Sequence, residues 1–124
     1  VYLQTGKAIS EWHKSSEINK IYNTFFSILL EQEREKNYKN CENRFDEFID
    51  KGAIEEVRYI KEKNFDRSLP GFKCLGVNWI LKYLDKEISL NDAIVLSKRD
   101  TRRYVKRQLT WFRHNFNPDL ILRI

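Results

Sequence analysis

The chain has 124 residues and a hydrophobic content of 41%, which suffices for one compact domain and not for two. Its aromatic content of 14% argues against a disordered chain, and no stretch approaches the roughly 18 uninterrupted apolar residues of a membrane span. The net charge of +5 arises from one segment, 98–113, whose seven basic residues and one acid sum to +6 and leave −1 for the remainder.

The first residues lack the features of a secretory signal, so we expect a cytoplasmic protein that has no membrane partner. Val1, Tyr2 and Leu3 precede a polar turn at 5–7, a pattern typical of the end of a helix. The chain also contains no methionine. From both observations we expect it to be a piece of a longer protein.

Residues 10–19 are polar and predict a short helix with Ser10 as its N-cap. The apolar run 24–30 is rich in aromatic and branched residues and, at seven residues, predicts a buried strand. A helical hairpin is predicted at about 33–63, with Gly52 as the C-cap of its first helix and Ile54 in its second. The apolar face of the first helix consists of Tyr38, Cys41, Phe45, Phe48 and Ile49.

Pro70 and Gly71 break the helical period and predict a loop, after which the period resumes in a helix of about 72–86. Ser89 is the predicted N-cap of the longest helix, about 89–115, which ends before Pro118. Residues 120–122 look like the start of a strand. The predicted fold class is mainly α with one or two short β-strands, and such strands need a sheet to join.

The longest helix is amphipathic, with an apolar side and a basic side. The apolar side carries Ile94, Thr101, Val105, Leu109, Phe112 and Phe116. The basic side carries Arg99, Arg102, Arg103, Lys106, Thr110 and Arg113. Like charges one turn apart repel, and the pairs Arg99–Arg103 and Arg103–Lys106 have little local relief in the sequence. Phosphates would offset this repulsion, with a solvated basic face as the alternative, and Trp111 belongs either to the core or to a base-stacking surface.

The stretch KRDTRRYVKRQLTWFR, 98–113, closely resembles the signature near the end of the tRNA dimethylallyltransferases. Three further stretches resemble motifs of this family, in the family's own order: VYLQTGKAISEW (1–12), RFDEFIDKGAIEEVRYI (44–60) and SLPGFKCLGVNWILKYLDKEISLNDAI (68–94). Several spaced motifs in one order are far more specific than any single motif. The resemblance implies that 1–124 is the C-terminal portion of an α/β P-loop-type transferase, with the nucleotide-type core half missing.

The resemblance implies tRNA modification. In this family the exocyclic amine of adenosine next to the anticodon attacks the allylic carbon of dimethylallyl diphosphate, and diphosphate leaves. A glycine-rich loop cradles the diphosphate with the assistance of Mg²⁺, and an upstream Asp acts as the general base. The implied partners are the tRNA anticodon stem-loop and dimethylallyl diphosphate, for a protein that is a monomer in its full-length form.

The resemblance also assigns roles to residues of this chain. Arg44 corresponds to an arginine that faces the donor diphosphate, with a surface arginine as the alternative. The segment 73–78 corresponds to a tRNA-contacting turn, although Val77 and Asn78 stand where the family usually has Tyr and often a basic residue. The expected tRNA-contacting residues are Lys73, Gly76, Asn78, Arg99, Arg103, Lys106, Arg107, Gln108, Thr110 and Arg113.

The glycines of the chain form no phosphate-binding loop, because Ala8 follows the Gly6–Lys7 pair where a Mg²⁺-binding hydroxyl is needed. Cys41 and Cys74 have no CxxC spacing and no nearby His, so we expect reduced thiols and no metal site. We therefore expect no catalytic residue and no independent transferase activity in this chain. The alternatives are a stand-alone helical RNA-binding module without catalysis and a structural helical domain that binds an acidic protein.

Overall fold

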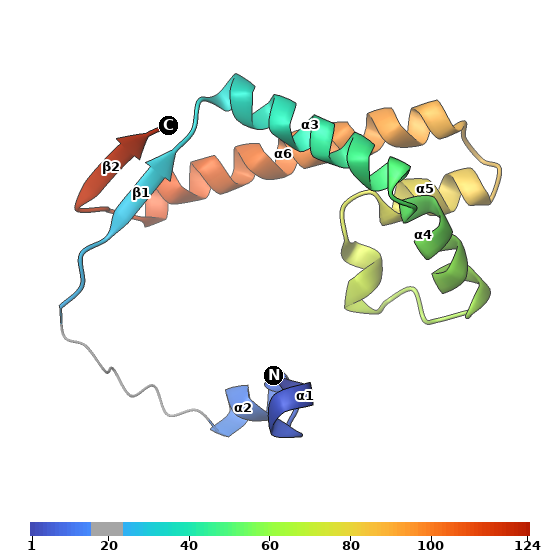
Figure 1. The fold of residues 1–124 in the computed structure, drawn as a ribbon, viewed down its shortest axis with the longest axis horizontal. Helices are drawn as coiled ribbons and strands as arrows, with labels where there is room; N and C mark the ends of the chain where they lie inside the picture. The colour runs from blue at the N-terminus through green and yellow to red at the C-terminus, as the bar shows by residue number, and fades with distance from the viewer. Residues whose placement is uncertain (16–23) are drawn as a thin grey trace.

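A computed structural model describes residues 1–15 and 24–124 and shows a mainly helical chain with two short strands (Figure 1). The predicted fold class is confirmed. The elements are α1 (Tyr2–Thr5), α2 (Ile9–Ser15), β1 (Ile28–Glu31), α3 (Arg34–Asp50), α4 (Ala53–Glu62), the 3-10 helix η1 (Pro70–Lys73), α5 (Val77–Leu84), α6 (Leu90–Asn115) and β2 (Leu120–Arg123). α3 and α6 run side by side, with the strands at one end of this pair and α4 and α5 at the other (Figure 1). None of the described helices is long and apolar enough to cross a membrane.

β1 and β2 form a parallel pair, in which Ile28 lies beside Leu120 and Glu31 beside Arg123. Parallel strands need a long crossover connection, and the helices α3 to α6 supply it. Asp119 fastens the start of the pair, because its Oδ2 accepts hydrogen bonds from the backbone N–H and the hydroxyl of Ser27, each at 2.7 Å. These bonds, the backbone one first, hold the pKa of the Asp119 carboxyl below its usual value.

The strand predicted at 24–30 is shorter and more exposed than expected. It spans only Ile28–Glu31, and Ile28 and Leu30 are 48% and 62% exposed. A parallel strand becomes buried when other layers cover both faces of its sheet, and within the described residues β1 has only β2 beside it. The second predicted strand is confirmed as β2.

α2 begins at Ile9, ahead of the predicted N-cap, so Ser10 lies inside the helix and is not its N-cap. The carboxylate of Glu11 accepts a hydrogen bond from the Ala8 N–H at 3.2 Å instead. α1 ends at Gly6, whose φ of 66° forms the turn that the polar residues predict. The end of the helix predicted at 10–19 lies outside the described residues.

α3 and α4 form a helical hairpin. The C-cap of α3 is Lys51 rather than Gly52, and Gly52 follows it with a φ of 97°, a conformation that L side chains rarely adopt. The hairpin packs on α5 and η1 through one hydrophobic cluster. The buried members of this cluster are Val57, Phe72, Ile80 and Leu81.

The helix predicted at about 72–86 is divided by Gly76. The loop predicted at Pro70 and Gly71 is the start of η1, and α5 begins only after Gly76. Gly76 has a φ of 92°, which no α-helix tolerates. A Cβ at this position would stand 2.7 Å from the ring of Phe45 and 3.5 Å from Ser97 Oγ, so only glycine fits between α3 and α6.

Ser89 is the N-cap of α6, as predicted. Its Oγ accepts a hydrogen bond from the Asp92 N–H at 3.1 Å and donates one to the Asp92 carboxylate at 2.7 Å. The buried face of α6 is narrower than the predicted apolar side and consists of Ala93, Ser97, Thr101 and Val105. Closer to the strands this side is less covered, and Phe112 is 38% exposed.

Candidate nucleic-acid interface

Two of the basic residues of α6 are ion-paired with α3. Lys98 Nζ lies 2.6 Å from Asp46 Oδ1, and Arg102 pairs with Glu42. Residues 98, 102 and 105 share one helix face, and because Val105 of this face is buried, the two cations lie along the packed side. The predicted basic side therefore included Arg102 wrongly.

Asp100 joins α5 to two arginines of α6. The indole Nε1 of Trp79 donates a hydrogen bond to Asp100 Oδ2 at 2.8 Å. Arg99 Nε and Arg103 Nη1 lie 3.3 Å and 3.6 Å from Asp100 Oδ1. The guanidinium of Arg99 also lies over the Trp79 ring, 5.7 Å from its centroid. The repulsion between Arg99 and Arg103 thus has local relief in the structure, contrary to the expectation from sequence.

The carboxyl of Asp100 is subject to opposing influences. Burial raises its pKa, whereas the hydrogen bonds from Trp79 and Arg99 and the charges of Arg99 and Arg103 lower it. The stabilising contacts outweigh burial, so the pKa of Asp100 lies below its usual value. The carboxylate is therefore ionised at neutral pH, and together with the two arginines it leaves one net positive charge.

Lys106 and Arg107 carry charges on α6 that no nearby carboxylate of the described chain offsets. No carboxylate in residues 1–15 and 24–124 pairs with either of them. Beside them lies an open groove of about 370 Å³, which we call the α6 groove, lined by Lys106, Arg107, Thr110, Trp111, His114 and Asn115. Trp111 is 55% exposed, so it belongs to the surface rather than to the core. Its ring packs edge-on against Phe112, with centroids 5.3 Å apart.

An exposed indole beside uncompensated cations can serve nucleic-acid binding, since bases stack on aromatic rings and cations neutralise phosphates. The sequence predicted Lys106, Arg107 and Thr110 but did not include Trp111, His114 or Asn115 in the contact set. The spacing could have indicated these three residues. Residues 107, 111 and 115, and likewise 106, 110 and 114, follow one another at four-residue steps along one face of the helix.

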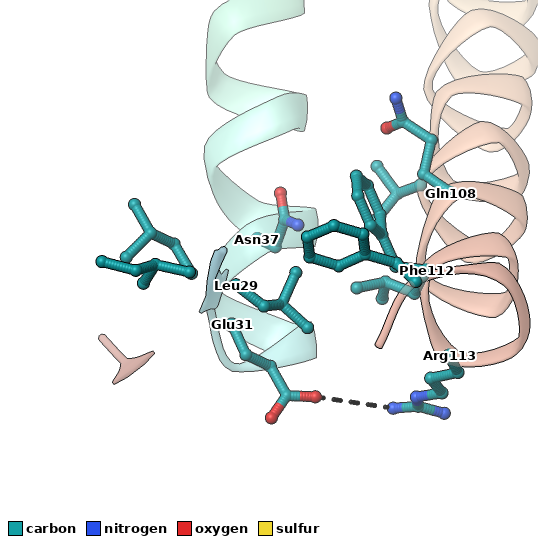
Figure 2. A pocket seen from close by; sticks show the side chains of 11 residues that line it. Leu29, Glu31, Asn37, Gln108, Phe112 and Arg113 are labelled. Atoms are coloured by element: carbon teal, nitrogen blue, oxygen red, sulfur yellow. Dashed lines mark ion pairs between the residues drawn. The ribbon is translucent and has the colours of Figure 1, made fainter. Parts of the chain in front are cut away.

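Gln108 and Arg113 lie on another side of α6. Both line an apolar pocket of about 360 Å³ between β1, α3 and α6, with Leu29 and Phe112 facing into it (Figure 2). Arg113 Nη2 lies 4.0 Å from Glu31 Oε1 (Figure 2). The structure therefore does not bring all predicted tRNA-contacting residues onto one surface.

The remaining predicted residues lie on other elements. Lys73 and Asn78 are exposed, on η1 and α5, whereas Gly76 is buried against Phe45. The need for glycine at position 76 is thus explained by its packing against Phe45 within the chain. The contact of Gly76 with tRNA stays a prediction. Arg44 is exposed on α3, and its diphosphate contact also stays a prediction.

No three His, Cys, Asp or Glu side chains converge in the part of the chain that the structure describes. Cys41 and Cys74 are both free thiols.

Fold and surface define a helical module with a basic, aromatic-bearing helix and a short parallel strand pair. Residues 1–115 match the family described as IPP transferase, and the chain belongs to this family. Relatives in two bacteria show the same likeness. The chain is 43% identical to a tRNA dimethylallyltransferase of Alkaliphilus oremlandii, covering 94% of the chain and 37% of the relative. It is 38% identical to one of a Wolbachia species, covering 98% and 41%.

Two solved structures have a similar fold. One is the tRNA delta(2)-isopentenylpyrophosphate transferase from Staphylococcus epidermidis, with a TM-score of 0.73 and 30% identity over 98% of this chain and 39% of that one. The other is the tRNA isopentenylpyrophosphate transferase from Bacillus halodurans, with a TM-score of 0.72 and 32% identity over 86% and 34%. The chain thus spans about two fifths of the length of the proteins that it matches.

Proposed function

We propose that this chain is the tRNA-contacting part of a cytoplasmic, monomeric tRNA dimethylallyltransferase. The whole enzyme transfers a dimethylallyl group from dimethylallyl diphosphate to the exocyclic amine of the adenosine next to the anticodon. The observation that carries the proposal is the α6 groove, where two uncompensated cations flank an exposed tryptophan in a chain of the IPP transferase family.

Each group in the groove has a distinct task in the proposal. Lys106 and Arg107 neutralise phosphates of the anticodon stem-loop, and these contacts set the position of the RNA rather than read its sequence. Trp111 offers its ring to an unstacked base. Arg99 and Arg103, held by Asp100, extend the cationic surface along α6.

The other predicted contacts complete the proposal. Arg44 contacts the diphosphate of the donor, while Lys73, Gly76 and Asn78 contact the tRNA near the start of α5. Gln108, Thr110 and Arg113 do so along α6. Mg²⁺ belongs to the whole enzyme, and since the described residues offer no set of metal ligands, no step through the metal is assigned to them. This chain alone has no transferase activity.

The alternative of a stand-alone RNA-binding module is less well supported. Two-stranded parallel sheets are marginal, and parallel strands are normally covered on both faces. Here Ile28 and Leu30 of β1 and Ile121 of β2 are all about half exposed or more, which favours a role for the pair within a larger sheet.

The test measures binding of the 124-residue chain to an RNA hairpin with the sequence of an anticodon stem-loop, at salt concentrations from about 50 to 200 mM. The logarithm of the binding constant should fall linearly with the logarithm of the salt concentration. Lys106→Ala and Arg107→Ala should each reduce the magnitude of this negative slope by about 0.7 to 0.9. The control Arg58→Ala removes an arginine that pairs with Glu55 on α4 and should leave the slope unchanged.

Two results would contradict the proposal. Equal slopes for the wild type, the two groove variants and the control would remove the α6 groove from RNA binding. Transfer of the dimethylallyl group to the hairpin by the chain alone would contradict the proposed lack of independent activity.

A further inference from the structure

A second group of cations lies at the carboxyl end of the two strands. Arg34 at the start of α3, Arg113 near the end of α6 and Arg123 at the end of β2 line one groove of about 380 Å³. We call these three residues the arginine cluster. This groove shares no lining residue with the α6 groove, so the two surfaces can be tested separately.

Two of the three arginines of the cluster contact one carboxylate, that of Glu31. Arg123 Nε lies 3.2 Å from Glu31 Oε2. Arg113 Nη2 lies 4.0 Å from Glu31 Oε1, and Figure 2 shows this pair. Arg34 donates its Nε–H to the hydroxyl of Tyr38 at 2.8 Å. A guanidinium carries five N–H donors and a carboxylate accepts about four hydrogen bonds, so Glu31 cannot satisfy the donors of the cluster.

The charge of the groove is also incompletely balanced. Its lining side chains comprise three arginines against Glu31 and Glu33. The side chains of Arg113 and Arg123 are 70% and 84% exposed, which leaves their guanidinium groups accessible to a ligand. Arginine presents a planar fork of donors that matches the oxygens of a phosphate group.

The position in the fold favours a ligand as well. Glu31 and Arg123 are the last register pair of the parallel strands, so the cluster lies at the carboxyl edge of the pair. In sheets of parallel strands, ligands bind outside this edge. Because three different elements contribute one arginine each, the cluster forms only when β2 pairs with β1.

We propose that Arg34, Arg113 and Arg123 bind a phosphate group at the carboxyl edge of the strand pair. Glu31 holds Arg113 and Arg123 in position, and the phosphate oxygens accept the donors that Glu31 leaves unsatisfied. The phosphate comes either from the RNA backbone or from a diphosphate, and the choice between these sources rests on the proposed function.

The first arm of the test uses inorganic pyrophosphate at constant ionic strength. The Nε–Hε resonances of Arg34, Arg113 and Arg123 in ¹⁵N-labelled chain should shift together with one dissociation constant. The double variant Arg34→Ala/Arg123→Ala should weaken this binding by about tenfold. The variant Arg34→Lys/Arg123→Lys keeps the charge and removes the planar fork of donors. Its affinity for pyrophosphate should therefore lie between those of the wild type and the double alanine variant. Arg58→Ala should bind like the wild type.

The second arm repeats the series with the anticodon stem-loop hairpin. Weaker RNA binding by the double variants, with a salt slope reduced by about 0.7 to 0.9 per arginine removed, assigns the phosphate to the RNA backbone. Weaker pyrophosphate binding with unchanged RNA binding assigns it to a diphosphate. If the alanine variants fail to fold, as judged by circular dichroism, the lysine variants decide.

The proposal is overturned if neither ligand distinguishes the folded double variants from the wild type. If Lys106→Ala still reduces the RNA salt slope in that case, the proposed function survives without the arginine cluster. If the chain binds no RNA but pyrophosphate shifts the three arginine resonances, the phosphate site survives and the tRNA contact fails.

Discussion

The indole N–H of Trp79 donates a hydrogen bond to Asp100 at 2.8 Å and thereby ties α5 to the basic helix α6. The same carboxylate contacts Arg99 and Arg103, so one acid both holds two helices together and offsets two cations that we propose to bind phosphate. When Asp100 loses its charge, we therefore expect the stability of the fold to fall and the affinity for RNA to rise.

Asp100→Asn should tighten binding of the anticodon stem-loop by about two- to threefold. The variant removes a negative charge next to two proposed phosphate contacts but keeps an oxygen that accepts the Trp79 hydrogen bond. The measurement is the dissociation constant at fixed, low salt. Weaker binding would mean that Asp100 acts chiefly by aiming the two arginines.

Trp79→Phe should lower the free energy of unfolding by about 1 kcal/mol, because the half-buried carboxylate of Asp100 loses a donor while the aromatic packing is kept. Urea denaturation followed by circular dichroism measures this change. In the double variant Trp79→Phe/Asp100→Ala the two losses should not add, because either substitution alone removes the hydrogen bond that the two residues share. Additive losses would show that the bond contributes nothing to stability.

Gly76→Ala should destabilise the chain by about 2 to 4 kcal/mol. The added Cβ would stand 2.7 Å from the Phe45 ring, and the positive φ at this position is strained for alanine. Gly71→Ala is the matched control, since a Cβ there meets no atom of the described chain within 4 Å and φ is not positive. Equal unfolding free energies for the two variants would contradict the packing role of Gly76.

Asp119→Ala should destabilise the strand pair in a manner that depends on pH. Because the folded pKa of Asp119 is lowered, its stabilising effect is fully present above the usual Asp pKa of about 3.9. It is lost as the pH falls from that value through the lowered folded pKa. The difference in unfolding free energy between wild type and variant should therefore shrink over this acidic range. A difference that stays constant with pH would show that the charge of Asp119 is not responsible.

Trp111→Ala should weaken binding of the anticodon stem-loop by about 1 to 3 kcal/mol, the range found when a stacked aromatic is removed. The salt slope should stay unchanged, since no cation is lost, and this separates stacking from the charge effect of Lys106→Ala. Trp111→Phe should retain part of the affinity. A loss of affinity that appears only as a change of slope would exclude stacking.

Local features of this protein could be predicted from the sequence because they depend on contacts within one helical turn. Ser89 caps α6 through Asp92, three residues away. Gly52 turns the chain between α3 and α4, although the C-cap of α3 is Lys51. The order of spaced motifs likewise identified the family, which the match over residues 1–115 confirmed. Errors arose at element ends, as at Ser10 and at the division near Gly76, where packing or a competing hydrogen bond decides.

The sequence by itself determined that α6 would be long, amphipathic and basic. Only the tertiary structure decided which of its cations are used within the fold. Arg102 and Lys106 look alike in the sequence, yet Arg102 pairs with Glu42, 60 residues away, while Lys106 faces the α6 groove. The arginine cluster could not be foreseen either, because Arg34 and Arg123 meet only after β2 pairs with β1. Ion pairs depend on distances between side chains that lie far apart along the chain, and helical periodicity contains no information about those distances.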